Sequence, residues 1–265
     1  MKHVEIYEYY SFGYNYHLLL DGRSNSSNKL CYNDLKKYID FIEELDLRVT
    51  LSSINLTNLD SDFEELSNLA KSEETSSLTV DSKFWAGIVE KLKKIDNTLD
   101  AELNIKIAYI LDEKRYSNEI LLEKIHKLFS SNTFLKLPPI AKFDFKESGK
   151  CLAFDRYTAC AFHSLRGTED VLKTYYELIL GKTASEGATW GTFEKEIMAA
   201  VTTNTLTPSP KEELLINIGS LRKFYRNKTQ HPQNTYSSDE AQDLFSLCIK
   251  TVNELIADLT LRNLI

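Results

Sequence analysis

The apolar residues of the chain recur mostly at steps of three and four positions, which is the spacing of an amphipathic helix. Residues 34–45, 60–72, 81–103 and 117–131 all have this spacing, and two of these stretches open with aspartate and serine in cap positions. The segment NIKIAYIL (104–111) departs from it and indicates a strand or an extended crossing segment. The tyrosine-rich start of the chain is compatible with one or two short strands or with an irregular helix.

A proline pair interrupts this pattern near the middle of the chain. LKLPPIAKFD (135–144) holds two of the five prolines, and a residue that precedes proline is disfavoured in helical geometry. We therefore place a domain boundary between residues 137 and 138. Residues 1–137 are predicted to form a mostly helical domain with a few short strands or extended segments, and residues 138–265 a second, almost uniformly helical domain.

The second domain is predicted to be an antiparallel four-helix bundle, because its helical stretches are joined by short turns. Gly181 stands where the first helix should end, as a C-terminal cap. Ser237 and Glu240 have the spacing of a capping box at the start of the last helix. The expected helices cover about 145–180, with a bend near residue 155, then 189–201, 210–229 and 239–259. The fold class is thus mainly α.

Composition restricts the chemistry. The chain has 32 basic and 39 acidic residues and a net charge of −7, so any nucleic acid must meet a local basic patch and not a globally basic surface. The four cysteines are scattered, without zinc-ligand spacing, so we expect neither a metal nor another cofactor. Cys160 and Cys248 lie on apolar helical faces and are expected to be small buried thiols. With no apolar run near the ~18 residues of a membrane span, we expect a cytoplasmic protein that has no contact with membranes.

One polar segment, YRNKTQHPQNTY (225–236), gathers candidate catalytic residues. On a regular helix Arg226 and His231 would point about 140° apart, but Pro232 should loosen the helix and let the imidazole return beside the guanidinium. RNA cleavage by its own 2′-hydroxyl needs proton transfer and charge stabilisation, and it needs no metal. Histidine supplies the first and arginine the second, and Asn227 would orient the imidazole or the phosphate.

Three more cations lie in this segment or just before it. Arg222, Lys223 and Lys228 form a basic rim that would attract RNA to an otherwise acidic protein. The alternative is an ordinary helix end, since basic residues gather at helix C-termini because of the helix dipole alone.

A carboxylate on the first bundle helix is a candidate partner for this segment. Glu169 falls at the flank of the apolar stripe, where a partly desolvated carboxylate requires a cation or a hydrogen-bond donor. Arg226 and Arg166 are the candidates, and Arg166 would also contact RNA. The alternative for Glu169 is an ordinary ion pair at the flank of the helix. The remaining polar residues of this helix are expected to point away from the core: His163, Asp170, Lys173 and Glu177.

The same residues carry a family resemblance. LRKFYRNKTQHP (221–232), with residues 150–182 before it and 239–256 after it, resembles the HEPN superfamily of higher-eukaryote and prokaryote nucleotide-binding domains. The resemblance covers about residues 141–260. It implies a helical bundle that dimerises so that two motifs meet in one cleft, which commonly gives a metal-independent endoribonuclease used as a toxin or an anti-phage effector.

The motif of this superfamily is an arginine, a polar residue and, after three or more positions, a histidine; Arg226, Asn227 and His231 match it. The resemblance maps the supporting acid of the first helix to Glu169. One subgroup has a tyrosine two residues after the histidine, where a partner nucleotidyltransferase modifies it, and Gln233 occupies that position here.

Three functional hypotheses follow. The first is a homodimeric ribonuclease that cleaves RNA and that an antitoxin or a defence-system partner controls. The second is a non-catalytic HEPN module that binds RNA, a nucleotide or a partner protein in such an assembly. The third is a purely structural helical protein, because a fold does not by itself imply a function.

Overall fold

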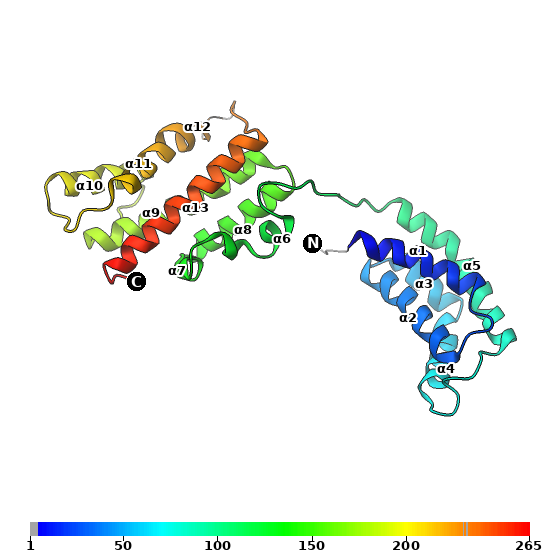
Figure 1. Cartoon of the computed structure of the whole chain (residues 1–265). Coiled ribbons are helices and arrows are strands. Elements are labelled where there is room, and N and C mark those ends of the chain that lie inside the picture. Colours follow the sequence, from blue (N-terminus) through cyan, green and yellow to red (C-terminus); the bar gives the residue numbers. More distant parts are fainter. Residues whose placement is uncertain (1–4, 230, 232) are drawn as a thin grey trace. The chain divides into compact units, whose positions relative to one another are not determined.

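The computed structural model describes residues 5–229, 231 and 233–265, which fold into two compact helical units (Figure 1). The units are Met1–Tyr109 and Ile110–Ile265. No β-strand occurs among the described residues, which contain only an isolated antiparallel bridge between Ser27 and Thr79. The predicted mainly α fold class is confirmed.

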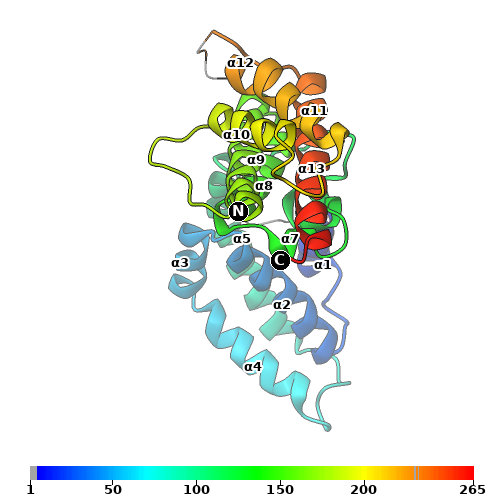
Figure 2. The ribbon, with the colours of Figure 1, turned by 90° about the vertical axis from the view of Figure 1, so that its left-hand side faces the viewer.

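The N-terminal unit is a helical domain (Figure 2), and its buried apolar residues form a core of their own. The tyrosine-rich start of the chain forms a helix and not strands, because Phe12 stacks on Phe41 and Tyr38 of the next helix, with ring centroids 4.3 and 5.4 Å apart. Within the unit, the second helix packs along the fourth and the third along the fifth. The helices are α1 (Ile6–Asp21), α2 (Asn28–Glu44), α3 (Arg48–Leu56), α4 (Leu59–Lys71) and α5 (Ser82–Asn104).

Residues 106–114 join the two units without helix or strand. Of the two predictions for NIKIAYIL, the extended crossing segment is confirmed and the strand is wrong. The compact units divide between Tyr109 and Ile110, earlier than the predicted boundary at residues 137 and 138. The reason is that Leu121 and Phe129 are buried in the core of the C-terminal unit. This stretch contains α6 (Asn118–Leu122), the 3₁₀-helix η1 (Ile125–Leu128) and α7 (Thr133–Lys136).

The proline pair starts a helix in the structure. Pro139 is the first residue of α8 (Pro139–Ala153), where the missing N–H of proline costs no helical hydrogen bond. Gly149 on this helix allows close contact with α6, because a Cβ at that position would lie 2.5 Å from the carbonyl oxygen of Leu121.

The predicted helix at 145–180 is two helices and not one bent helix. It is interrupted at residues 154–156, where Asp155 has a left-handed backbone (φ 58°), and α8 then packs along α9 (Tyr157–Leu180). The predicted cap at Gly181 is confirmed, with φ 63° and its N–H bonded to the carbonyl of Glu177. The later helices are α10 (Trp190–Thr202), α11 (Glu212–Ser220), the π-helix η2 (Leu221–Arg226), α12 (Asn227–Thr229) and α13 (Ser238–Leu261).

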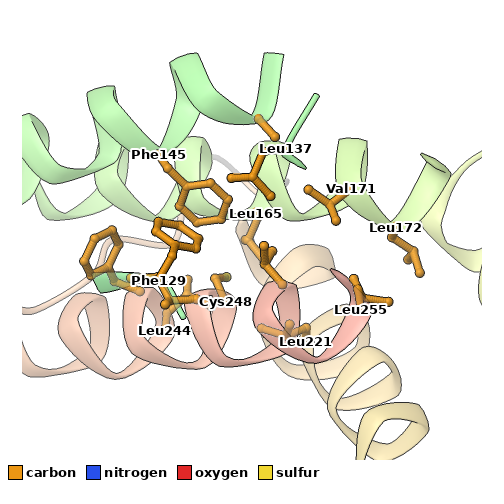
Figure 3. Packing of buried hydrophobic residues seen from close by; sticks show 14 of the residues in the cluster. Phe129, Leu137, Phe145, Leu165, Val171, Leu172, Leu221, Leu244, Cys248 and Leu255 are labelled. Atoms are coloured by element: carbon orange, nitrogen blue, oxygen red, sulfur yellow. The ribbon is translucent and has the colours of Figure 1, made fainter. Parts of the chain in front are cut away.

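Helix α9 is the centre of the C-terminal unit, with α8, α10 and α13 packed against it (Figure 1). Apolar side chains from these helices interdigitate, and the rings of Phe129 and Phe145 meet edge to face at 5.0 Å (Figure 3). Cys160 and Cys248 are fully buried free thiols, as predicted, and burial raises their pKa values to about 11 and about 12.

The last helix begins as the sequence predicts. Ser237 and Glu240 form a reciprocal capping box, in which the Glu240 carboxylate accepts the Ser237 backbone N–H at 3.0 Å. Of the helices formed by the described residues, none has the length and apolar character that crossing a bilayer requires.

Candidate functional site

The candidate motif begins inside a π-helix. In η2 the backbone N–H of Asn227 bonds to the carbonyl of Arg222, five residues back, in place of the four of an α-helix. Both η2 and the short helix α12 that follows it contact α9. Such π-turns occur frequently at functional sites.

Arg226, the last residue of this π-helix, pairs with Glu169 on α9. The Nε atom of Arg226 lies 3.3 Å from Oε2 of Glu169, and the two side chains are 26% and 23% exposed. The other carboxylate oxygen of Glu169 accepts the backbone N–H of Trp190, at the start of α10, at 3.1 Å. Glu169 therefore holds the arginine and also binds a free N–H of a helix N-terminus.

Arg166, the other predicted partner of Glu169, pairs with a different carboxylate. Its Nε and Nη2 atoms bind Asp144 of α8 at 2.7 and 2.5 Å, in a bidentate arrangement. His163 binds the same carboxylate, with Nδ1 2.8 Å from Oδ1. Asp144 is fully buried, and Gly167 makes room for it, since a Cβ there would lie 3.1 Å from the Asp144 Cβ.

These two networks open onto one pocket of about 190 Å³. Two arginines and a histidine line the pocket with one carboxylate, Glu169, while the buried Asp144 pairs with Arg166 and His163. Because Glu169 binds Arg226 through Nε, the other guanidinium nitrogens of Arg226 can bind an anionic group next to the apolar side chains. The lining residues are Phe162, His163, Leu165, Arg166, Glu169, Arg226 and Thr229.

His163 lies outside the apolar stripe of α9, as predicted, but it does not point into solvent. It is half-buried between α8 and the pocket. Sequence reasoning missed both His163 and Asp144 as site residues. No motif marks them, and a continuous helix from residue 145 to 180 would have separated them.

His231, the predicted proton-transfer group, is exposed in the turn after α12. Its backbone N–H bonds to the Lys228 carbonyl, and its own carbonyl accepts the Asn234 N–H, each at 3.1 Å. It does not line the pocket of its own chain, and no hydrogen bond or ion pair joins its imidazole to another described residue. The predicted return of the imidazole to Arg226 is therefore not seen, and Pro232, on which it depended, lies outside the described residues.

The predicted basic rim is partly neutralised. Arg222 pairs with Glu194 of α10, and Lys228 lies 3.2 Å from the Glu240 carboxylate. Lys223 is exposed and stands over the ring of its neighbour Phe224, 5.1 Å from the centroid. Asn227 is exposed beside these residues. Lys223 and Asn227 are thus the rim side chains most open to a ligand.

Gln233, two residues after His231, is exposed. The nearby Tyr236 is 5% exposed, and its hydroxyl lies 2.7 Å from Oγ1 of Thr229. Burial raises its pKa. Its role in the structure is to hold the turn against α12.

Comparison of the chain with models of protein families, with curated proteins and with solved structures gives no match. The resemblance to the HEPN superfamily therefore rests on the motif residues themselves. Among the described residues, no three His, Cys, Asp or Glu side chains gather in an arrangement that could hold a metal ion.

Proposed function

We propose that the C-terminal unit is a metal-independent endoribonuclease of the HEPN type, which cleaves RNA by attack of the 2′-hydroxyl at a site composed from two copies of the chain. The observation that carries this proposal is the ion pair of Arg226 with Glu169 in the wall of the pocket. It supports the role that the motif gives to the arginine, because a guanidinium held by a carboxylate is already oriented for its ligand.

In this proposal Arg226 holds the phosphate that is cleaved. Among the described residues its bond to Glu169 uses Nε only, so both Nη groups remain for non-bridging phosphate oxygens. His231 transfers a proton, and Asn227 orients the imidazole or the phosphate. Arg166, Lys223 and the rest of the basic rim guide the RNA strand.

The composite site accounts for the position of His231. On its own chain this side chain is exposed and lies outside the pocket, so a second copy that docks against the motif can bring its His231 to the bound phosphate. We propose that the enzyme acts in the cytoplasm as a toxin or an anti-phage effector, and that an antitoxin or defence-system protein controls it.

A second candidate function is a HEPN module that binds RNA, a nucleotide or a partner protein without cleaving RNA. The same observation about His231 favours it, because one chain alone has two arginines at the pocket but no motif histidine there. Such a pocket would bind a phosphate group and leave it intact.

Incubation of the purified protein with total RNA in EDTA separates the two candidates. The first predicts fragments that are absent with His231→Ala. The second candidate predicts that the protein binds RNA, and that the RNA remains intact with the wild-type protein and with His231→Ala. If the wild-type protein and His231→Ala cleave RNA at the same rate, the proposed role of His231 is wrong.

A further inference from the structure

The pocket contains a histidine to which the proposed function gives no task. Nδ1 of His163 lies 2.8 Å from Oδ1 of Asp144, and the imidazole lines the pocket with 27% of its side chain exposed. Asp144 has no exposed surface. A histidine that is held on one side by a buried carboxylate and is open on the other side has the arrangement of a general base.

The contact with Asp144 determines which ring nitrogen carries the hydrogen. An ionised carboxylate can only accept hydrogen bonds, and the bidentate guanidinium of Arg166 is the partner of an ionised carboxylate. Nδ1 of His163 is therefore the donor, and the lone pair of the neutral ring is on Nε2. Nε2 points away from Asp144, and the imidazole is a lining residue of the pocket.

We infer that His163 is the general base of this pocket, that Asp144 is its positioning residue, and that the group it deprotonates is the 2′-hydroxyl of a ribonucleotide. The inference rests on the proposed ribonuclease function. Nε2 takes the proton of the 2′-hydroxyl while the 2′-oxygen forms a bond to phosphorus, and the bond from phosphorus to the 5′-oxygen breaks. The 5′-oxygen takes a proton from the His231 of a second copy, which leaves a 2′,3′-cyclic phosphate and a 5′-hydroxyl.

The neighbouring side chains fit such a substrate. Arg226, across the pocket, can bind the phosphate while His163 approaches the adjacent ribose. Phe162 lines the same pocket and is 46% exposed, so its ring can stack on a base. The rings of Phe143 and His163 pack in a T-shaped arrangement, with centroids 6.4 Å apart.

The charges around His163 come from three elements. Asp144 faces it from α8, Arg166 and Glu169 from its own helix, and Arg226 from η2. A general base contributes to the pH dependence of the rate, so the pH profile of cleavage should differ between the wild type and a variant without the imidazole.

The substitution His163→Asn separates a catalytic role from a structural one. The asparagine amide can donate to Asp144 from about the position of Nδ1, but it has no counterpart of Nε2. We expect the melting curve of the variant to overlay that of the wild type and its cleavage rate to fall about a hundredfold or more. Imidazole added to His163→Ala should restore part of the rate. The matched control is His17→Asn, which alters an exposed histidine beside a carboxylate, Asp21, in the N-terminal unit and should cleave normally.

Each outcome of this experiment has one meaning. If the wild type cleaves RNA and His163→Asn cleaves at the same rate with the same pH profile, His163 is structural and the inference is overturned, while the proposed function stands. If the folded wild type leaves RNA intact, the proposed function fails and the role of His163 fails with it. Loss of cleavage in a folded His163→Asn, with rescue of His163→Ala by imidazole, supports the inference.

Discussion

Glu169 and Arg226, 57 positions apart in the sequence, meet in the wall of a pocket, with Oε2 and Nε 3.3 Å apart. Both side chains are about three-quarters buried, so their attraction is screened by water less than that of a surface pair. Glu169 also binds the first backbone N–H of α10. The arginine of the motif is therefore positioned by a carboxylate that is itself held in place.

This pair predicts unequal effects of its two substitutions. Arg226→Ala should lower the cleavage rate about a hundredfold or more, because in the proposed function it removes the cation that stabilises the transition state. Glu169→Gln keeps an acceptor for the Trp190 N–H but loses its charge, so we expect a fall of roughly tenfold. A double-mutant cycle on the free energy of unfolding should give a coupling of about 0.5–1 kcal/mol. Strict additivity in both rate and stability would show that the pair does not act together.

The composite site predicts a two-fold dimer at micromolar concentration, with twice the chain mass of 30.5 kDa. Light scattering measures this mass directly. A sharper test mixes Arg226→Ala with His231→Ala after both are unfolded and refolded together. Half of the dimers then contain one chain of each variant, and one of the two sites in such a dimer has both Arg226 and His231. The mixture should therefore recover about a quarter of the wild-type rate. A strict monomer, or a mixture as inactive as its components, would contradict the composite site.

The contact between α6 and α8 predicts that Gly149→Ala is destabilising. Its Cβ would lie 2.5 Å from the Leu121 carbonyl oxygen, and the backbone there must shift, at a cost of about 1–3 kcal/mol. Gly87→Ala is the matched control, since the space around that helical glycine is open and alanine should stabilise α5 by about 0.5–1 kcal/mol. Denaturant unfolding measures both. Equal changes for the two variants would show that this helix contact is looser than described.

Glu102 makes the stability of the N-terminal unit depend on pH. Burial would raise its pKa, but the backbone and hydroxyl groups of Thr50 and the Val49 N–H bind its carboxylate and lower the pKa overall. The ionised Glu102 carboxylate therefore stabilises the folded state in full at pH values above the pKa of Glu102 in the unfolded chain, near 4. This stabilisation is lost as the pH falls through the lower pKa that Glu102 has in the folded chain. Glu102→Gln should cost about 1 kcal/mol at pH 7 and close to nothing near pH 2. A loss of stability on Glu102→Gln that is equally large at pH 7 and at pH 2 would contradict this prediction.

Much of the fold could be predicted from local patterns. The apolar stripe of α13 and its capping box lie within one segment, so the sequence contains all the information about that helix. The break between α8 and α9 could not be predicted in the same way. The sequence indicates a bend near residue 155, but a full break depends on the left-handed backbone of Asp155, a conformation that aspartate adopts only in a minority of cases.

The same break explains what was missed at the site. The flank position of Glu169 was enough to predict a partner for it, and the structure gives it Arg226. Asp144 and His163 would lie about 28 Å apart along one continuous helix, and only the turn between α8 and α9 brings them together. The position of His231 depends on the turn after α12, which a helical pattern cannot specify.

The central claim is that this protein cleaves RNA through the 2′-hydroxyl without a metal ion. The most direct measurement incubates the wild-type protein, in EDTA, with a defined RNA and with the same strand carrying 2′-deoxyribose at the cleaved position. We predict fragments with a 2′,3′-cyclic phosphate and a 5′-hydroxyl from the first strand, none from the second, and none from either with Arg226→Ala or His231→Ala. Equal cleavage of both strands, fragments ending in a 5′-phosphate, or no cleavage by the folded wild-type dimer would contradict the account.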